Sequence, residues 1–385
     1  MVSVCHLNQG LVFGDMGQKS YFVMVIRVLG TLYQVLCTPH PVPRANMQIR
    51  TFYCFPLCAF FLFMCFSLKA QDPHFSQSWL APLQMNPALA ATSKWDTRIG
   101  GQWKEQWSSV PVSYRTFSAF YDQKLHQLKL PAGKLGVGGV LMYDQAGDSK
   151  LSWTQIGLRV SYVLPLTDVH QISAGAGFDF GQRAFLPEQL QFGDQYNGEF
   201  FDPNQNTGEQ FGQQSSGLGS LVAGLNYQAH DPRSRSELNT GIAASHLNGP
   251  TLTFFNTSGI KVPIWARFYA FGQLELNEDW DFTAVHHFFR QGAYQEILLG
   301  AGARYHMPYK GSDLGLGAGL NYRFQDALIL NLEARYQQWL FGLSYDINTS
   351  GFQTATNRRG GLELALHYYL MQARPPEEFK SCPIF

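Results

Sequence analysis

The stretch "DLGLGAGLNYR", residues 313–323, alternates between apolar side chains and small or polar ones. One face of an extended chain would carry its leucines with Ala318 and Tyr322, and the other face its glycines with Asn321 and Arg323. Successive side chains of a β-strand point to opposite faces, so this pattern predicts a strand with one apolar and one polar face. Its length suits a tilted membrane-crossing strand, which needs about 9–11 residues.

The same alternation recurs along the chain in about fourteen segments, from near Arg98 to near Leu370. The clearest further examples are "KLGVGGVLMYD" (134–144), "QISAGAGFDFG" (171–181), "LILNLEARYQ" (328–337) and "GLELALHYYL" (361–370). Segments 237–247 and 262–273 are weaker, so twelve or sixteen strands remain alternatives. We therefore predict an all-β fold, a transmembrane antiparallel β-barrel of outer-membrane type with about 14 strands. A soluble β-sandwich or lipocalin-like barrel is the competing interpretation.

The links between these segments also alternate in length. Short links follow the even-numbered segments, at 165–168, 277–279, 308–313 and 337–338, with 123–133 as a longer exception. Long links follow odd-numbered segments, at 183–216, 248–263 and 348–359. In outer-membrane barrels the short turns face the periplasm. We therefore expect both termini of the mature chain to be periplasmic.

The stretch "FFLFMCFSLKAQDPHFSQ", residues 60–77, changes abruptly from apolar to polar. Arg50, the apolar run and the small Ala70 predict a secretory signal peptide over 47–70. Residues 1–46 are then an upstream extension absent from the mature protein, with a second membrane helix as the alternative. The mature chain divides into a periplasmic N-terminal segment (71–96), the barrel (97–370) and a periplasmic tail (371–385).

Composition excludes some functions. The net charge is zero and 15% of residues are charged, so nothing indicates nucleic-acid binding. Five of the six cysteines precede the predicted cleavage point, and Cys382 alone would remain. The mature protein therefore has neither an internal disulfide nor a cysteine metal site.

No arrangement of residues indicates an enzyme, a cofactor or a metal. His286 and His287 are adjacent, so a strand directs them to opposite faces and they cannot bind one ion together. No serine lies in a G-x-S-x-G elbow. An outer-membrane esterase that pairs a serine with His367 across strands remains an alternative that the sequence does not select.

Charged residues occupy the predicted lumen face of several strands. We interpret them as an internal network of ion pairs, with the selectivity lining of a pore as the alternative. The set comprises Arg159, Asp179, Arg304, Arg323, Glu333, Arg335, Asp346 and Glu363.

The link 183–216 is rich in aromatic residues. Loops often carry function and aromatic anchors dominate protein interfaces, so this loop is a candidate partner-binding surface. The alternative is a loop folded inward as a plug. Its aromatic residues are Phe185, Phe192, Tyr196, Phe200, Phe201 and Phe211.

Two groups of motifs resemble the PorP/SprF family of type IX secretion system outer-membrane proteins. The first comprises "QDPHFSQ" (71–77), Asn86-Pro87-Ala88 and Gln106-Trp107, and the second "SYDIN" (344–348) and "GGLEL" (360–364). The resemblance extends over the mature chain. It departs from the family pattern at Ala91, where glycine is usual, and at Lys104, where arginine is common.

The resemblance implies a non-enzymatic role. Such proteins act with other type IX secretion components in the secretion and surface attachment of adhesin-type cargo with a C-terminal sorting domain, and in gliding motility. The implied surroundings are outer-membrane lipids and secreted protein, and no cargo-contacting residue can be transferred. A FadL-like or porin-type transporter is the alternative function.

Overall fold

The computed structural model describes residues 72–106, 114–126, 130, 132–147, 149–209, 212–254, 260–351 and 356–371. The predicted signal peptide, the upstream extension and all but the first residue of the C-terminal tail lie outside these ranges. The described residues belong to the compact unit that begins at Asp72.

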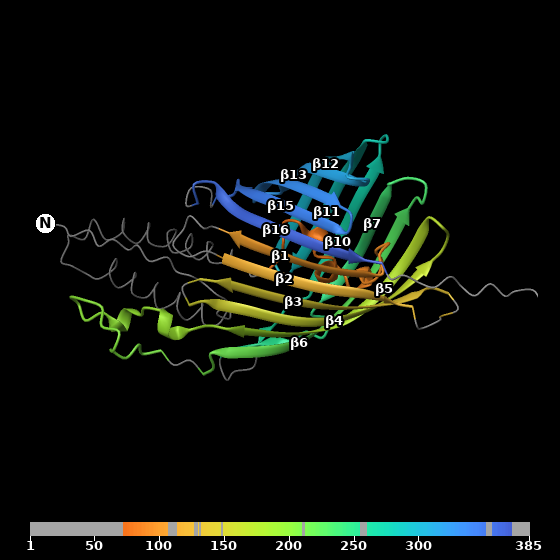
Figure 1. Ribbon diagram of the computed structural model, residues 1–385. Helices are drawn as coiled ribbons and strands as arrows, with labels where there is room; N and C mark the ends of the chain where they lie inside the picture. Colours follow the sequence, from red (N-terminus) through yellow and green to blue (C-terminus); the bar gives the residue numbers. More distant parts are fainter. Residues whose placement is uncertain are drawn as a thin grey trace, which may run out of the picture. The chain divides into compact units, whose positions relative to one another are not determined.

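Fourteen antiparallel strands form one closed barrel, in which β1 pairs with both β2 and β16 (Figure 1). The predicted fold and strand number are confirmed, and the two weak segments form β7 and β10. A separate two-stranded sheet pairs β8 (Thr251–Leu252) with β9 (Ile260–Lys261). The barrel strands are β1 (Thr97–Gln106), β2 (Tyr114–Leu125), β3 (Lys134–Ala146), β4 (Leu151–Pro165), β5 (His170–Ala184), β6 (Ser215–His230), β7 (Glu237–Ser245), β10 (Trp265–Glu275), β11 (Trp280–Gln291), β12 (Tyr294–Tyr309), β13 (Ser312–Arg323), β14 (Ala327–Tyr336), β15 (Trp339–Asn348) and β16 (Arg359–Leu370).

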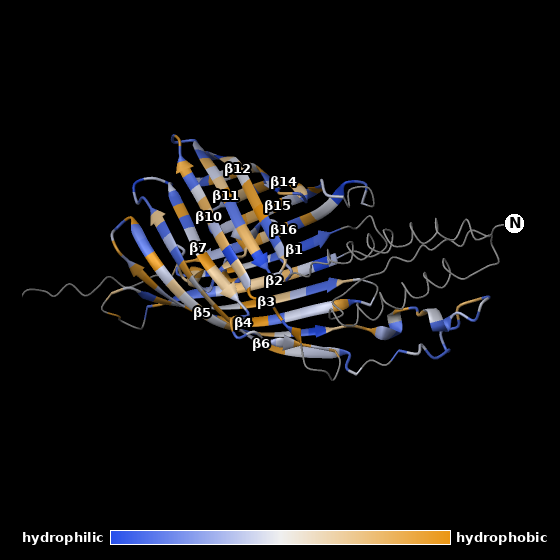
Figure 2. Ribbon diagram, turned by 180° about the vertical axis from the view of Figure 1, so that it is seen from behind, coloured by the Kyte–Doolittle hydropathy of each residue, from blue (hydrophilic) through white to orange (hydrophobic). Residues whose placement is uncertain are grey.

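The alternation in sequence becomes an apolar outer wall and a polar inner wall. On β14, Leu330 and Leu332 are 49% and 54% exposed on the outer face, whereas Ile329, the residue before Leu330, is fully buried. Hydrophobic and hydrophilic residues alternate along the strands (Figure 2). In the part of the chain that the structure describes, no helix is both long and apolar enough to cross a membrane.

The long loops and the shortest turns lie at opposite rims of the barrel. Residues 185–214, 246–264 and 349–358 connect strands at one rim, here called the long-loop rim. The other rim, here called the short-turn rim, carries two-residue turns such as Lys310-Gly311 and Gln337-Gln338. The predicted segregation of long links to one side is therefore present.

Residues 72–96, here called the inner segment, lie inside the barrel (Figure 1). They form the short helical turns η3 (Ser78–Leu80), α3 (Pro82–Met85) and η4 (Pro87–Leu89). Phe75, Leu83 and Ala88 are at most 1% exposed. This position differs from the periplasmic location expected for 71–96. The reason is packing, because the polar inner wall supplies hydrogen-bond partners for the inner segment. The alternation within a single strand does not reveal these partners.

The inner segment runs through the lumen from one rim to the other. Asp72 contacts His246 and Gln291, which follow β7 and end β11 at the long-loop rim. At the opposite rim, the Asp96 amide donates to the carbonyl of Leu370 (3.0 Å). The described chain therefore begins at the long-loop end of the lumen and ends at the short-turn end.

Glycines of the wall make room for this segment. A Cβ atom at Gly175 of β5 would lie 2.3 Å from the Ala88 nitrogen, and one at Gly224 of β6 would lie 2.2 Å from Asn86 Oδ1. Such separations are too short for non-bonded atoms, so glycine is required for the close approach of the inner segment.

Candidate functional site

The aromatic loop between β5 and β6 has its own local structure. Two single helical turns, η5 (Pro187–Gln189) and η6 (Gly193–Gln195), precede a bridge between Tyr196 and Phe201. Between the bridged residues, Asn197 Oδ1 accepts hydrogen bonds from the amides of Glu199 and Phe200, both at 3.0 Å. The turn is therefore held by its own hydrogen bonds.

The six aromatic residues of this loop have different surroundings. Tyr196 and Phe200 are 55% and 58% exposed, and their turn projects away from the barrel wall (Figure 1). Phe185, Phe192 and Phe201 are half-buried, and Phe185 packs edge-to-face against Phe254 with ring centroids 5.0 Å apart. Phe211 lies outside the described residues. The inner segment occupies the lumen, and Tyr196 and Phe200 lie at the surface of the protein.

The eight predicted lumen charges all lie on inward-facing positions, but they form separate groups. Arg159 of β4 pairs with Asp179 of β5 at 2.6 Å, and both are nearly buried. Arg304 of β12 pairs with Glu333 of β14 at 2.6 Å, across a glycine of β13, and Arg335 reaches the same carboxylate at 2.7 Å.

The remaining predicted charges hold the inner segment. Arg323 pairs with Asp346 at 2.8 Å, and the Ser76 hydroxyl donates to that carboxylate at 2.8 Å. The Glu363 carboxylate accepts from the backbone amides of Ser76 and Gln77, both at 2.8 Å. These charges act as a binding surface for the protein's own chain.

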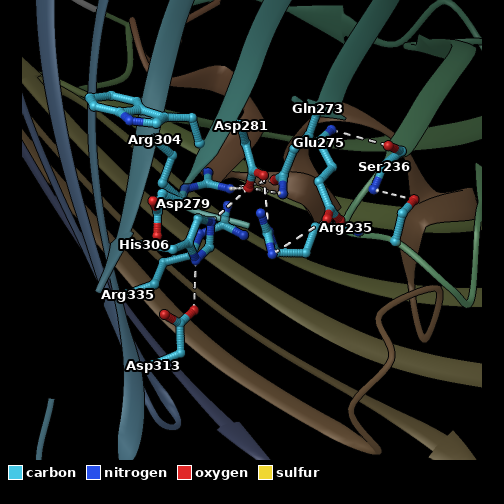
Figure 3. A network of polar contacts seen from close by, with 12 residues as sticks. Arg235, Ser236, Gln273, Glu275, Asp279, Asp281, Arg304, His306, Asp313 and Arg335 are labelled. Atoms are coloured by element: carbon cyan, nitrogen blue, oxygen red, sulfur yellow. Dashed lines mark hydrogen bonds and ion pairs between the residues drawn. The ribbon is translucent and has the colours of Figure 1, made fainter. Parts of the chain in front are cut away.

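A further polar cluster near the short-turn rim was not predicted (Figure 3). The fully buried Asp281 carboxylate of β11 accepts from Arg235 (2.9 Å), Gln273 (2.7 Å) and His306 (2.7 Å). His306 also contacts Asp313 at 2.6 Å. These residues come from different strands and the β6–β7 turn, so no local sequence pattern predicts that they lie together.

Asn86 of the N-P-A motif links the inner segment to the barrel wall. Its side-chain amide donates to the carbonyls of Leu225 (2.9 Å) and Ile242 (3.2 Å), while its oxygen accepts from the Ala88 amide (2.8 Å). It also donates to the Tyr269 hydroxyl. The motif was visible in the sequence, but its partners on three strands were not.

Two buried serine–histidine–carboxylate chains bear on the esterase alternative. Ser78 Oγ lies 2.9 Å from His287 Nδ1, whose Nε2 lies 2.8 Å from Glu296. A second chain joins Ser220, His246 and Asp72 at 2.9 and 2.7 Å. Both serines are at most 4% exposed, and His367 instead contacts the Leu80 carbonyl at 2.9 Å. A nucleophile needs access to substrate, so we interpret both chains as links between the inner segment and the wall.

Among the described groups outside the strands, the Asp72 carboxyl has a pKa that departs from its usual range. Burial raises the pKa of this carboxyl, but its hydrogen bond with His246, the charges of His246 and Arg183, and its bond with Gln291 outweigh burial and hold the pKa below its usual range. The carboxylate form is therefore favoured at the long-loop end of the lumen.

Within the described residues, no group of three or more histidine, cysteine or acidic side chains is arranged to hold a metal ion. A cavity of about 950 Å³ lies between the inner segment and the short-turn ends of the strands.

Residues 67–368 match the family described as "Type IX secretion system membrane protein PorP/SprF". The chain belongs to the PorP/SprF family. Family membership and the closed barrel with its apolar outer wall identify an outer-membrane protein of this secretion system. No curated protein matches the sequence.

Among solved structures, the chain is similar to the CymD monoaromatic hydrocarbon channel, with 10% identity and a TM-score of 0.42 over 79% of this chain and 96% of that one. It is also similar to the toluene transporter TodX of P. putida, with 11% identity and a TM-score of 0.43 over 75% and 93%. The KdgM porin gives 10% identity and a TM-score of 0.31 over 71% and 99%. At these values the likeness adds nothing to the functional argument.

Proposed function

We propose that this PorP/SprF protein is a non-enzymatic component of type IX secretion that supports secretion and surface attachment of adhesin-type cargo with a C-terminal sorting domain. The observation that carries the proposal is the ordered turn of the β5–β6 loop, which presents Tyr196 and Phe200 at the long-loop rim. In outer-membrane barrels that rim faces the cell exterior. An exposed aromatic pair on a preformed turn can enter a partner's pocket with little ordering cost.

The transporter alternative has weaker support. A conducting channel needs a continuous path, whereas wall side chains hold the inner segment from one rim to the other. The charged groups on the wall are largely engaged with one another or with that segment. They therefore favour a packed interior over a selectivity lining.

The decisive experiment is the double variant Tyr196→Ala/Phe200→Ala in cells that export the cargo. We expect a folded, heat-modifiable barrel in the outer membrane and release of cargo from the surface into the medium. An aromatic anchor can contribute 2 kcal/mol or more, roughly a thirtyfold change in affinity.

Phe324→Ala is the matched control, because Phe324 is 46% exposed on a short turn at the same rim. It should retain cargo. Conductance of the purified proteins in planar bilayers tests the alternative: retained cargo in the double variant, together with a conducting wild-type protein, would favour a transporter.

A further inference from the structure

Glycines on adjacent strands leave room for the cavity near the short-turn rim. Gly302 of β12 and Gly317 and Gly319 of β13 line its wall, where larger side chains would project into the lumen. Trp79 and Leu80 of the inner segment line the opposite side. The cavity is thus bounded by the barrel wall and by the inner segment.

Four buried side-chain atoms of the lining have no hydrogen-bond partner among the residues that the structure describes. Two are donors, Arg304 Nε and Asn321 Nδ2, and two are acceptors, Asn239 Oδ1 and Asn331 Oδ1. Arg304 and Asn321 are only 5% and 2% exposed. Buried polar atoms in folded proteins nearly always have partners, so this set indicates a site for a polar ligand.

The combination of donors and acceptors matches the peptide group, which supplies one N–H and one C=O per residue. The adjoining wall already binds a polypeptide main chain. Arg159 donates to the Leu83 carbonyl (3.1 Å), Ser161 donates to the Ala90 carbonyl (2.6 Å), and His367 contacts the Leu80 carbonyl. The cavity continues this wall with the same kinds of side chain.

The mouth of the cavity adds a preference for charge and for apolar side chains. Lys94 and Lys134 line it, and both are exposed without an ion pair to any described residue. Trp95, stacked on Tyr369 with ring centroids 5.9 Å apart, presents an aromatic face beside Lys94. Carboxylates would meet the two ammonium groups, and apolar side chains would pack on the rings.

We propose that this cavity binds an extended acidic polypeptide segment that enters through the short-turn rim. The site lies at the opposite end of the barrel from Tyr196 and Phe200, so it is a second interaction site. The main chain of the ligand pairs with the asparagines and Arg304, and its acidic side chains lie near Lys94 and Lys134.

Fluorescence anisotropy with the purified mature protein in detergent micelles tests this site. The probe is a fluorescein-labelled decapeptide of glutamate and glycine with one central phenylalanine, and its counterpart carries lysine in place of glutamate. The acidic probe should bind at least about tenfold more tightly. Asn321→Leu and Asn331→Leu should each weaken it by about fivefold, as expected for the loss of one hydrogen bond.

Ser344→Ala is the matched control, because the Ser344 hydroxyl is also buried and without a partner among the described residues but does not line the cavity. It should bind the acidic probe like the wild type. Should either leucine variant fail to assemble, Lys94→Glu/Lys134→Glu provides an independent test, since both side chains are exposed. That variant should reverse the preference towards the lysine probe.

Equal binding of the two probes, or unchanged binding in both leucine variants, would overturn the proposal. Displacement of the probe by an N-acetylglucosamine tetramer but not by unlabelled acidic peptide would reassign the site to an amide-bearing sugar.

Discussion

The side-chain amide of Asn86 donates a hydrogen bond of 3.0 Å to the Tyr269 hydroxyl, which in turn donates to Asn226 at 2.8 Å. Tyr269 is fully buried and packs with Met85 and Leu89 of the inner segment. This contact joins residues 183 positions apart in the sequence and fixes the inner segment to β10.

Asn86→Leu should loosen the inner segment. The substitution leaves two wall carbonyls and the Tyr269 hydroxyl without the donor they now share, at a cost of about 1–3 kcal/mol for each buried polar group left unpaired. Tyr269→Phe should cost less, because Asn86 keeps its two carbonyl partners. Limited cleavage by chymotrypsin within residues 72–96 should be fastest in Asn86→Leu, slower in Tyr269→Phe and slowest in the wild type. Equal protection of all three would contradict a structural role for the contact.

Ala91→Gly should stabilise the protein. Ala91 has a φ of 58°, a left-handed conformation that costs a non-glycine residue about 1–2 kcal/mol. Part of that gain is offset by the greater freedom of glycine in the unfolded chain. Ala90→Gly is the control, since Ala90 has a φ of −62° and glycine there should destabilise. Thermal loss of heat modifiability measures both, and a lower transition temperature for Ala91→Gly would argue against strain at this position.

Arginine should be tolerated differently on the two faces of β14. Leu330 faces outward near the middle of the strand, where arginine should cost about 2–4 kcal/mol in the bilayer. Asn331 faces inward, so Asn331→Arg should be milder because the new charge meets polar groups. The yield of folded protein in the outer membrane provides the comparison. If Leu330→Arg assembles as well as Asn331→Arg, the assignment of the outer face to lipid is wrong.

Acid should weaken the long-loop end of the inner segment. The pKa of Asp72 is lower in the folded protein than in the unfolded chain, so its contribution to stability is present above the unfolded pKa, near 4, and is lost as the pH falls through the folded value. At neutral pH, Asp72→Asn should therefore increase hydrogen exchange near residues 72–77. Once the pH has fallen below the folded pKa of Asp72, the variant and the wild type should converge, because both side chains are then uncharged. A constant difference across this range would assign the effect to packing.

Processing and topology can be tested on the envelope protein. N-terminal sequencing should begin at or close to Gln71, and a chain starting at Met1 or Met47 would exclude a cleaved signal peptide.

An epitope at Gly198, in the β5–β6 loop, should be reachable on intact cells, whereas one at Gly311, in the β12–β13 turn, should not. Labelling at Gly311 alone would reverse the assigned orientation.

The sequence by itself determined the class of fold, an expected count of about fourteen strands and the distribution of long loops. These features depend on a two-residue period and on link length, which are local properties of the chain. Leu330 and Asn331 show how directly neighbouring side chains reveal the two faces of the wall. The inward position of the eight predicted charges followed from the same alternation.

Only the tertiary structure decided what fills the barrel. The partners of the inner segment are scattered over strands that meet only after closure, as Ser76 with Glu363 and Asn86 with Tyr269 illustrate. From the sequence alone, Gly175 and Gly224 do not differ from other small lumen-facing residues. Their close contact with the inner segment shows why glycine is required. Hydrogen bonds across hundreds of residues leave no periodic signal, so the sequence alone marked residues 71–96 as a separate, periplasmic segment and did not place them inside the wall.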